Sequence, residues 1–201
     1  MKKLSIVFTL LFILGSFASA SAVDQTGKFA VGGHFGYSFG FGDAFKKYEW
    51  EEDWGTGYEG LKRQNKVTYS FWGNVKYGLS PNWALMGALD YQAGDVEFSA
   101  TGGGITPDVN ESYDWTSILG NLVLTLSPEK QTCPYFTGGG GIYINDDVTK
   151  PGMNFGGGIE HFFQNNLALD VGARYHMIFT EENSPNYVSV YAGINYYLGW
   201  K

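Results

Sequence analysis

The residues best suited to chemistry are charged side chains that recur at regular places in a chain with few charges overall. They lie among alternating apolar residues, and the set is Lys76, Asp90, Glu160, Asp170, Arg174 and His176. Carboxylates beside cations can hold a buried salt-bridge network, or they can re-pair as a gate for small ions. Counting along the strands predicts two layers, Lys76 with Glu160 or Asp170, and Arg174 with Asp90. A structural network and an ion gate are both open alternatives.

A catalytic interpretation requires a nucleophile within hydrogen-bond reach of a base. His161 falls on the opposite alternation phase from the charged residues, with no serine in phase beside it. His34 and Ser38 share a phase, but four strand residues separate them by roughly 13 Å. We therefore predict no catalytic residues and no enzyme, unless a Ser–His contact exists at the rim.

No cofactor or metal site is predicted. Cys133 is the only cysteine and cannot form an internal disulfide. The glycine runs at 102–104 and 138–141 lack the Lys-Ser/Thr that a phosphate-binding loop needs. The net charge of −7 disfavours nucleic acid as a partner.

The elements that must position the charged residues are strands, because apolar residues recur with period two. In residues 28–42, Phe29, Phe35 and Phe39 alternate with small or polar residues such as His34 and Ser38. Seven further segments show the same alternation: 67–79, 83–93, 116–127, 134–144, 153–163, 167–179 and 187–200. The connections alternate between long ones, such as 43–66, and tight ones, such as 80–82. Eight antiparallel strands with both termini at the tight-turn end are therefore expected.

The two faces of these strands have opposite chemistry. One face carries bulky aromatic residues in nearly every strand, and the other carries small residues and the charges. A soluble core would not bury five charged groups while exposing rings of Phe, Tyr and Trp. Lipid reverses this preference. We predict an all-β, eight-stranded antiparallel transmembrane up-and-down barrel with a polar interior.

A signal peptide is expected at residues 1–22, before the barrel domain at 23–201. Lys2 and Lys3 precede an apolar run at 4–14, and small residues offer cleavage after Ala20 or Ala22. The apolar run is shorter than the roughly 20 residues that a spanning helix needs.

The sequence resembles the small eight-stranded outer-membrane barrels of Gram-negative bacteria, the barrel part of the outer-membrane protein A type and its X and W relatives. The resemblance is strongest in GGGIEHFFQNNLALDVGARYH (156–176) and NVKYGLSPNWALMGALDY (74–91). We expect no peptidoglycan-binding domain after the barrel. The C-terminal YAGINYYLGW resembles the signal read by the outer-membrane assembly machinery, through Tyr191, Gly193, Tyr196, Leu198 and Trp200.

The resemblance implies a location in the cell outer membrane and a structural or interaction role: membrane integrity, with surface loops for adhesion or binding. A narrow porin-like channel for ions or small solutes is the alternative, and a lipid-modifying enzyme is a third. Expected partners are outer-membrane lipids, including lipopolysaccharide, and the barrel assembly machinery. Basic residues of the first loop could meet lipopolysaccharide phosphates: Lys46, Lys47, Lys62, Arg63 and Lys66. The sequence names no surface ligand.

Overall fold

The structure is a computed structural model that describes residues 24–41, 48–50, 58–102, 109–112, 114–145, 148–180 and 186–199. This part of the chain folds as one antiparallel sheet of ten strands. The strands are β1 Phe29–Phe41, β2 Tyr48–Trp50, β3 Tyr58–Gly78, β4 Trp83–Gly102, β5 Val109–Ser112, β6 Trp115–Thr125, β7 Thr132–Asn145, β8 Val148–Gln164, β9 Leu167–Ile178 and β10 Asn186–Tyr197. No helix within these ranges has the length and apolar character needed to cross a membrane.

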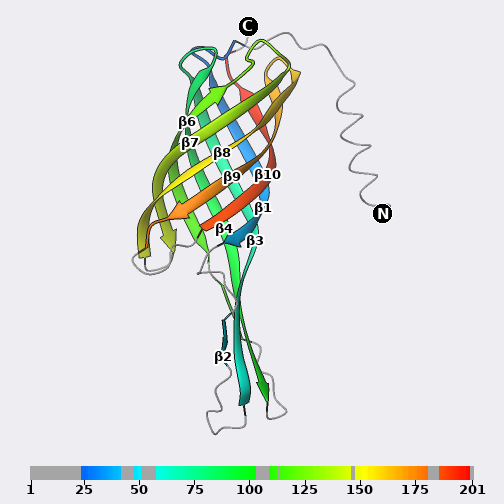
Figure 1. Ribbon diagram of the computed structural model, residues 1–201. Coiled ribbons are helices and arrows are strands. Elements are labelled where there is room, and N and C mark those ends of the chain that lie inside the picture. Colours follow the sequence, from blue (N-terminus) through cyan, green and yellow to red (C-terminus); the bar gives the residue numbers. More distant parts are fainter. Residues whose placement is uncertain are drawn as a thin grey trace, which may run out of the picture.

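Eight of the strands close into a barrel, which confirms the predicted fold (Figure 1). β1 pairs with β10 on one side and with β3 on the other, and the ladder continues through β4, β6, β7, β8 and β9. Closure gives every barrel strand two neighbours, so no backbone edge is left to face lipid.

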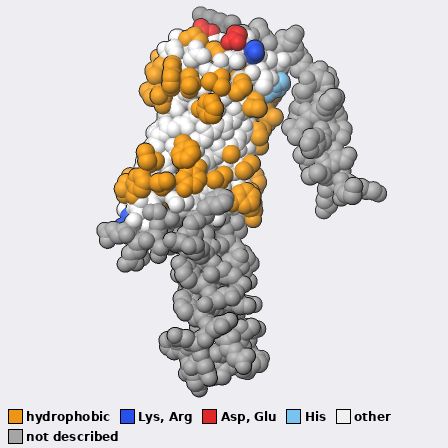
Figure 2. All heavy atoms as spheres, viewed as in Figure 1, with side chains coloured by type: hydrophobic (Ala, Val, Ile, Leu, Met, Phe, Trp, Pro, Cys, Tyr) orange, Lys and Arg blue, Asp and Glu red, His pale blue; other side chains and the backbone are white. Residues whose placement is uncertain are grey.

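The alternation seen in the sequence separates the two faces of the barrel wall. On β1, Phe29 and Phe35 are 50% and 56% exposed, whereas His34 and Ser38 are 6% and 0% exposed. The other barrel strands repeat this pattern, so bulky apolar side chains cover the outside. On the face shown in Figure 2 they gather in two belts, with a paler band between them. An apolar surface of this extent is suited to lipid rather than to water.

Tight turns and both described ends of the chain lie at one end of the barrel, the tight-turn end (Figure 1). The backbone N–H of Leu198 donates to Phe29 O at 2.7 Å and thereby ties the last described residues to the first strand. In the 80–82 turn, Asn82 Nδ2 donates to Thr125 O at 2.8 Å and holds the turn against β6.

At the end of the barrel opposite the tight turns, the sequence predicted a long connection at 43–66, and this prediction was wrong in part. β3 begins at Tyr58 and β4 continues to Gly102, so residues 58–67 and 94–102 pair well beyond the barrel, flanked by β2 and β5. We call this four-stranded extension the ribbon; it projects from the barrel in Figure 1. An irregularity between Val67 and Ser70 marks where the barrel ends. Strands outside the barrel have no lipid or lumen to face, so they need no apolar alternation, and the sequence pattern did not reveal them.

A charge placed on the outer face should destabilise the barrel according to its depth. Phe35→Arg, midway along β1, should lower the free energy of unfolding by about 2–4 kcal/mol, and Phe179→Arg, just beyond the end of β9, by about 0–1 kcal/mol. Urea titrations of both variants in lipid vesicles measure the difference. Equal losses at the two positions would contradict a lipid-facing outer surface.

Candidate functional site in the barrel lumen

Side chains from all eight barrel strands fill the lumen. At the tight-turn end, an apolar cluster closes the interior: Ala30, Cys133, Phe162, Ala168 and Tyr197. A second apolar cluster includes Met86, Leu119 and Val123 on β4 and β6 and extends to aromatic residues of other strands, such as Trp72 and Tyr143. The lumen is therefore not uniformly polar, and its polar groups lie among these apolar side chains.

The polar layer nearest the tight-turn end is centred on the carboxylate of Glu160. Lys76 Nζ donates to Glu160 Oε1 at 2.8 Å, so the lysine takes one of the two partners expected for it. Asn195 Nδ2 donates to the same oxygen at 2.6 Å, and the Tyr197 hydroxyl reaches Oε1 and Oε2 at 3.1 and 3.0 Å. One cation and two neutral donors thus compensate this buried carboxylate.

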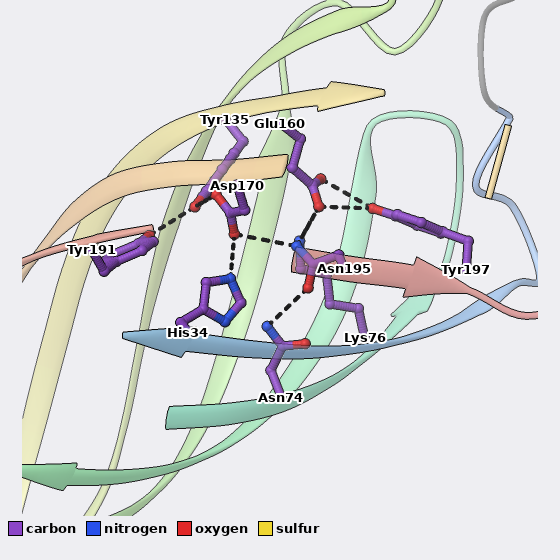
Figure 3. A network of polar contacts seen from close by, with 9 residues as sticks. All are labelled: His34, Asn74, Lys76, Tyr135, Glu160, Asp170, Tyr191, Asn195 and Tyr197. Carbon is purple, nitrogen blue, oxygen red and sulfur yellow. Dashed lines mark hydrogen bonds and ion pairs between the residues drawn. The ribbon is translucent and has the colours of Figure 1, made fainter. Parts of the chain in front are cut away.

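Asp170 extends the same layer toward the middle of the barrel (Figure 3). His34 Nε2 lies 2.9 Å from Asp170 Oδ2, and the Tyr135 hydroxyl donates to Oδ1 at 2.7 Å. Asn195 also donates to Asp170 at 3.2 Å and so links the two carboxylates. We call these residues the Glu160–Asp170 network: His34, Asn74, Lys76, Tyr135, Glu160, Asp170, Tyr191, Asn195 and Tyr197.

Glycines on the inner wall make room for this network. A Cβ at Gly158 would meet the Tyr135 hydroxyl at 2.7 Å, and one at Gly193 would overlap the His34 ring. A Cβ at Gly172 would likewise meet the Tyr191 hydroxyl at 2.7 Å. The inward glycines of the strands therefore supply space in which ring-bearing side chains of neighbouring strands lie flat on the wall.

A second polar layer lies toward the ribbon end. His176 Nδ1 contacts the Tyr143 hydroxyl at 3.0 Å, and its ring stacks on Tyr187 with centroids 4.5 Å apart. His176 Nε2 is 3.8 Å from Asp90 Oδ2. Near the end of the barrel, Ser38 Oγ donates to Gln92 Oε1 at 2.6 Å and contacts Ser189 Oγ at 2.7 Å.

The expected pairing of Arg174 with Asp90 is corrected here. Within the described chain no ion pair joins them, since Asp90 lies beside His176 and the Arg174 guanidinium lies 4.3 Å from the centre of the Trp72 ring. The guanidinium also lies 5.8 Å from the centre of the Tyr191 ring. Counting along strands ignored the tilt of the strands, which moves residues at equal distances from a turn to different positions around the barrel.

One contact that the sequence did not predict lies on the outer face at the tight-turn end. Thr132 Oγ1 is 2.9 Å from His161 Nδ1, because the two residues are opposite each other on β7 and β8. The contact depends on the register between β7 and β8, whereas the alternation in the sequence shows only which residues of one strand share a face. His161 Nε2 has no hydrogen-bond partner in the described part of the chain, so no carboxylate there orients the ring as a catalytic triad requires.

The residues expected to form the assembly signal divide between the two faces. Tyr191 and Gly193 point inward, and Tyr196 and Leu198 point outward. Trp200 lies outside the described residues. Among the residues described, no group of three or more His, Cys, Asp or Glu side chains is placed to hold a metal ion.

Removing one member of the Lys76–Glu160 pair should cost more than removing both. Lys76→Met leaves a buried carboxylate without its cation and should lower the free energy of unfolding by about 3–5 kcal/mol. The double variant Lys76→Met/Glu160→Gln should regain a large part of that loss, as seen in urea titrations in vesicles. If the double variant were the less stable of the two, the pair would not be the source of the penalty.

Glycine-to-alanine substitutions should destabilise the barrel on its inner face and not on its outer face. Gly158→Ala should lower the free energy of unfolding by about 1–3 kcal/mol, because the new methyl group overlaps Tyr135 and the Val171 carbonyl oxygen. Gly33→Ala is the matched control, since nothing lies within 4 Å of its Cβ position. Equal losses in the two variants, measured by the same titration, would refute the packing role of the inward glycines.

Comparisons with known proteins agree with this architecture. The family model described as outer membrane protein beta-barrel domain matches residues 8–197. The crystal structure of the outer membrane protein OprG from Pseudomonas aeruginosa is similar with a TM-score of 0.57 and 11% identity, over 89% of this chain and 99% of OprG. Neisserial surface protein A has a TM-score of 0.55 and 14% identity, over 84% of this chain and 96% of its own. No curated protein sequence matches the chain. The family match spans most of the sequence, and the chain therefore belongs to the outer membrane protein beta-barrel domain family.

Proposed function

We propose that this protein is a non-conducting barrel of the outer membrane, with a structural role in the barrel and an interaction role in the ribbon. The observation that carries the proposal is the Glu160–Asp170 network. The hydrogen bond from Lys76 on β3 to Glu160 on β8 spans the lumen between opposite sides of the barrel. The Asn195–Glu160 and Tyr135–Asp170 bonds each join strands two apart along the wall. An eight-stranded barrel has an interior only just wide enough for its side chains, so such a network leaves no continuous path.

The interaction role is supported by the length of the ribbon. β3 and β4 have 21 and 20 residues, about twice the 9–11 that a tilted strand needs to cross a bilayer. We propose that the tight turns lie on the periplasmic side and that the ribbon extends from the cell surface. Basic residues of this region, Lys62, Arg63 and Lys66, are suited to lipopolysaccharide phosphates.

Two further assignments belong to this proposal. The leader at 1–22 would be removed on export, after Ala20 or Ala22. The C-terminal segment containing Tyr191, Gly193, Tyr196, Leu198 and Trp200 would be recognised by the barrel assembly machinery. Its outward Tyr196 and Leu198 side chains are 44% and 46% exposed, as a recognised segment requires.

A lipid-modifying enzyme is the weaker alternative. The Thr132–His161 contact at the outer rim is the one observation in its favour. General-base activation of a hydroxyl needs an imidazole whose second nitrogen is held in place. The described residues provide no such partner for His161 Nε2, so we assign no catalytic role to the pair.

One comparison tests both parts of the proposal. The wild type and a variant in which residues 42–67 and 95–114 are each replaced by a short Gly-Ser turn would be refolded into lipid and checked for heat-modifiable gel migration. In planar bilayers, neither protein should give unitary conductance steps, since the network is unchanged. In vesicles containing lipopolysaccharide, the wild type should bind added soluble lipopolysaccharide and the variant should not.

The conductance and binding measurements each have a result that would contradict the proposal. Reproducible conductance steps from the wild type would reject the closed lumen and favour the channel. Undiminished lipopolysaccharide binding by a folded ribbon-replaced variant would reject the ribbon as the interaction surface. A known porin inserted in the same bilayers serves as the positive control for conductance.

A further inference from the structure

The segment ahead of β1, residues 24–28, lies at the tight-turn end of the barrel and bonds to the end of β3. Gln25 is 5% exposed, whereas its neighbours Asp24 and Thr26 are exposed. Gln25 belongs to no strand, so strand alternation does not explain why it alone of these residues is buried. We call residues 24–28 the strap, and Gln25 is the residue that the strap inserts into the barrel.

Gly78, the last residue of β3, provides the space that Gln25 occupies. A Cβ at Gly78 would overlap the Gln25 carbonyl oxygen and would meet the carbonyl carbon at 2.6 Å. Apart from the chain neighbours of Gly78, the three heavy atoms nearest to that Cβ position all belong to Gln25. Gly78 is an inward residue of its strand. The strap therefore occupies part of the tight-turn mouth, by which we mean the opening of the lumen at the tight-turn end.

Backbone hydrogen bonds hold the strap in this place. Gly27 N–H donates to Gly78 O at 2.8 Å, and Gly78 N–H donates to Lys28 O at 3.0 Å. Within the strap, Lys28 N–H donates to Gln25 O at 3.0 Å and closes a tight turn. Gly27 lies inside this turn with a φ of 70°, a backbone conformation that favours glycine. The position of Gln25 therefore depends on glycine at two places, one in the strap and one in β3.

The strap covers the side of the tight-turn mouth to which the apolar cluster contributes no residue. The members of that cluster come from β1, β7, β8, β9 and β10, whereas the strap bonds to β3. Ala84, the second residue of β4, is the register partner of Gly78 and is only 4% exposed. Inward neighbours on adjacent strands have Cβ positions about 5 Å apart, so Gln25 lies beside Ala84 as well. The strap and the apolar cluster together close the mouth.

We infer that the strap is a cap that controls entry to the lumen from the tight-turn end, and that it lifts by rotation at Gly27. Among the described residues, one backbone hydrogen bond joins residues 24–27 to β3, the bond from Gly27 N–H to Gly78 O. Lifting the strap leaves β1 in place, because this strand begins at Phe29. Segments held by few bonds open at much lower free energy than the fold as a whole. The inference rests on the fold alone and holds whether or not the lumen conducts.

A cysteine at position 84 reports on the strap. In folded Ala84→Cys, checked by heat-modifiable gel migration in detergent, the thiol at position 84 should react slowly with a water-soluble maleimide. Native Cys133 is the internal reference, since it is 0% exposed on β7 and its thiol donates to Lys130 O at 2.9 Å. Mass spectrometry of the two cysteine peptides measures the two labelling rates separately.

Two substitutions added to Ala84→Cys should displace the strap and leave the barrel wall intact. Gly78→Ala places a methyl group where the Gln25 carbonyl lies, and Gly27→Val disfavours the positive φ that the turn requires. Each should raise the labelling rate at position 84 about tenfold, because losing one or two hydrogen bonds shifts an opening equilibrium by that order. The labelling rate of Cys133 should stay unchanged.

Gly73→Ala is the matched control on the same strand, because only Gly32 O lies within 4 Å of its Cβ position, at 3.7 Å. It should leave both labelling rates unchanged. The inference is overturned if the thiol at position 84 reacts as fast in folded Ala84→Cys as in the denatured protein, or if it stays equally protected in folded Gly78→Ala and Gly27→Val. It is also overturned if these two variants expose Cys133 to the same extent, since the barrel rather than the strap would then have opened.

Discussion

The structure depends on one constraint: a polar group within the bilayer must find its partner inside the protein. Barrel closure meets this requirement for the backbone, because β1 pairs with both β10 and β3. The Glu160–Asp170 network meets it for the charges, since Lys76, Asn195, Tyr135 and Tyr197 surround two carboxylates at hydrogen-bond distance. The proposed closed lumen follows from the same requirement, because the Lys76–Glu160 bond that compensates a charge also spans the interior from β3 to β8.

Glycine links this constraint to the unusual composition of the chain. The chain has 29 glycines, and those described in the barrel strands serve two surfaces with different needs. Inward glycines such as Gly158 and Gly193 lie under tyrosine and histidine rings that carry the hydrogen-bonding atoms of the network. Outward glycines such as Gly33 and Gly87 have open space at the Cβ position and lie among the bulky residues that face lipid. A narrow barrel can therefore hold large polar side chains without widening.

The sequence predicted the barrel well because lipid and lumen impose opposite chemistry on alternate residues. The eight barrel strands, the inward direction of Glu160 and the outward direction of Phe35 all follow from a period of two. The ribbon was missed because strands outside the barrel need no such alternation. The partner of Arg174 was missed because strand tilt, which the sequence does not state, decides which lumen residues meet. The Thr132–His161 contact was missed for the related reason that it depends on register between strands.

The central claim is that direct contacts inside the lumen compensate the carboxylates of the Glu160–Asp170 network, with Lys76 and Glu160 as the closest ion pair. Solid-state NMR of the selectively labelled protein in lipid bilayers tests it most directly, through a nitrogen–carbon correlation between Lys76 Nζ and the Glu160 side-chain carboxyl carbon. We predict a strong through-space cross-peak between these two atoms, which Glu160→Gln weakens. A folded barrel without that cross-peak would contradict the account.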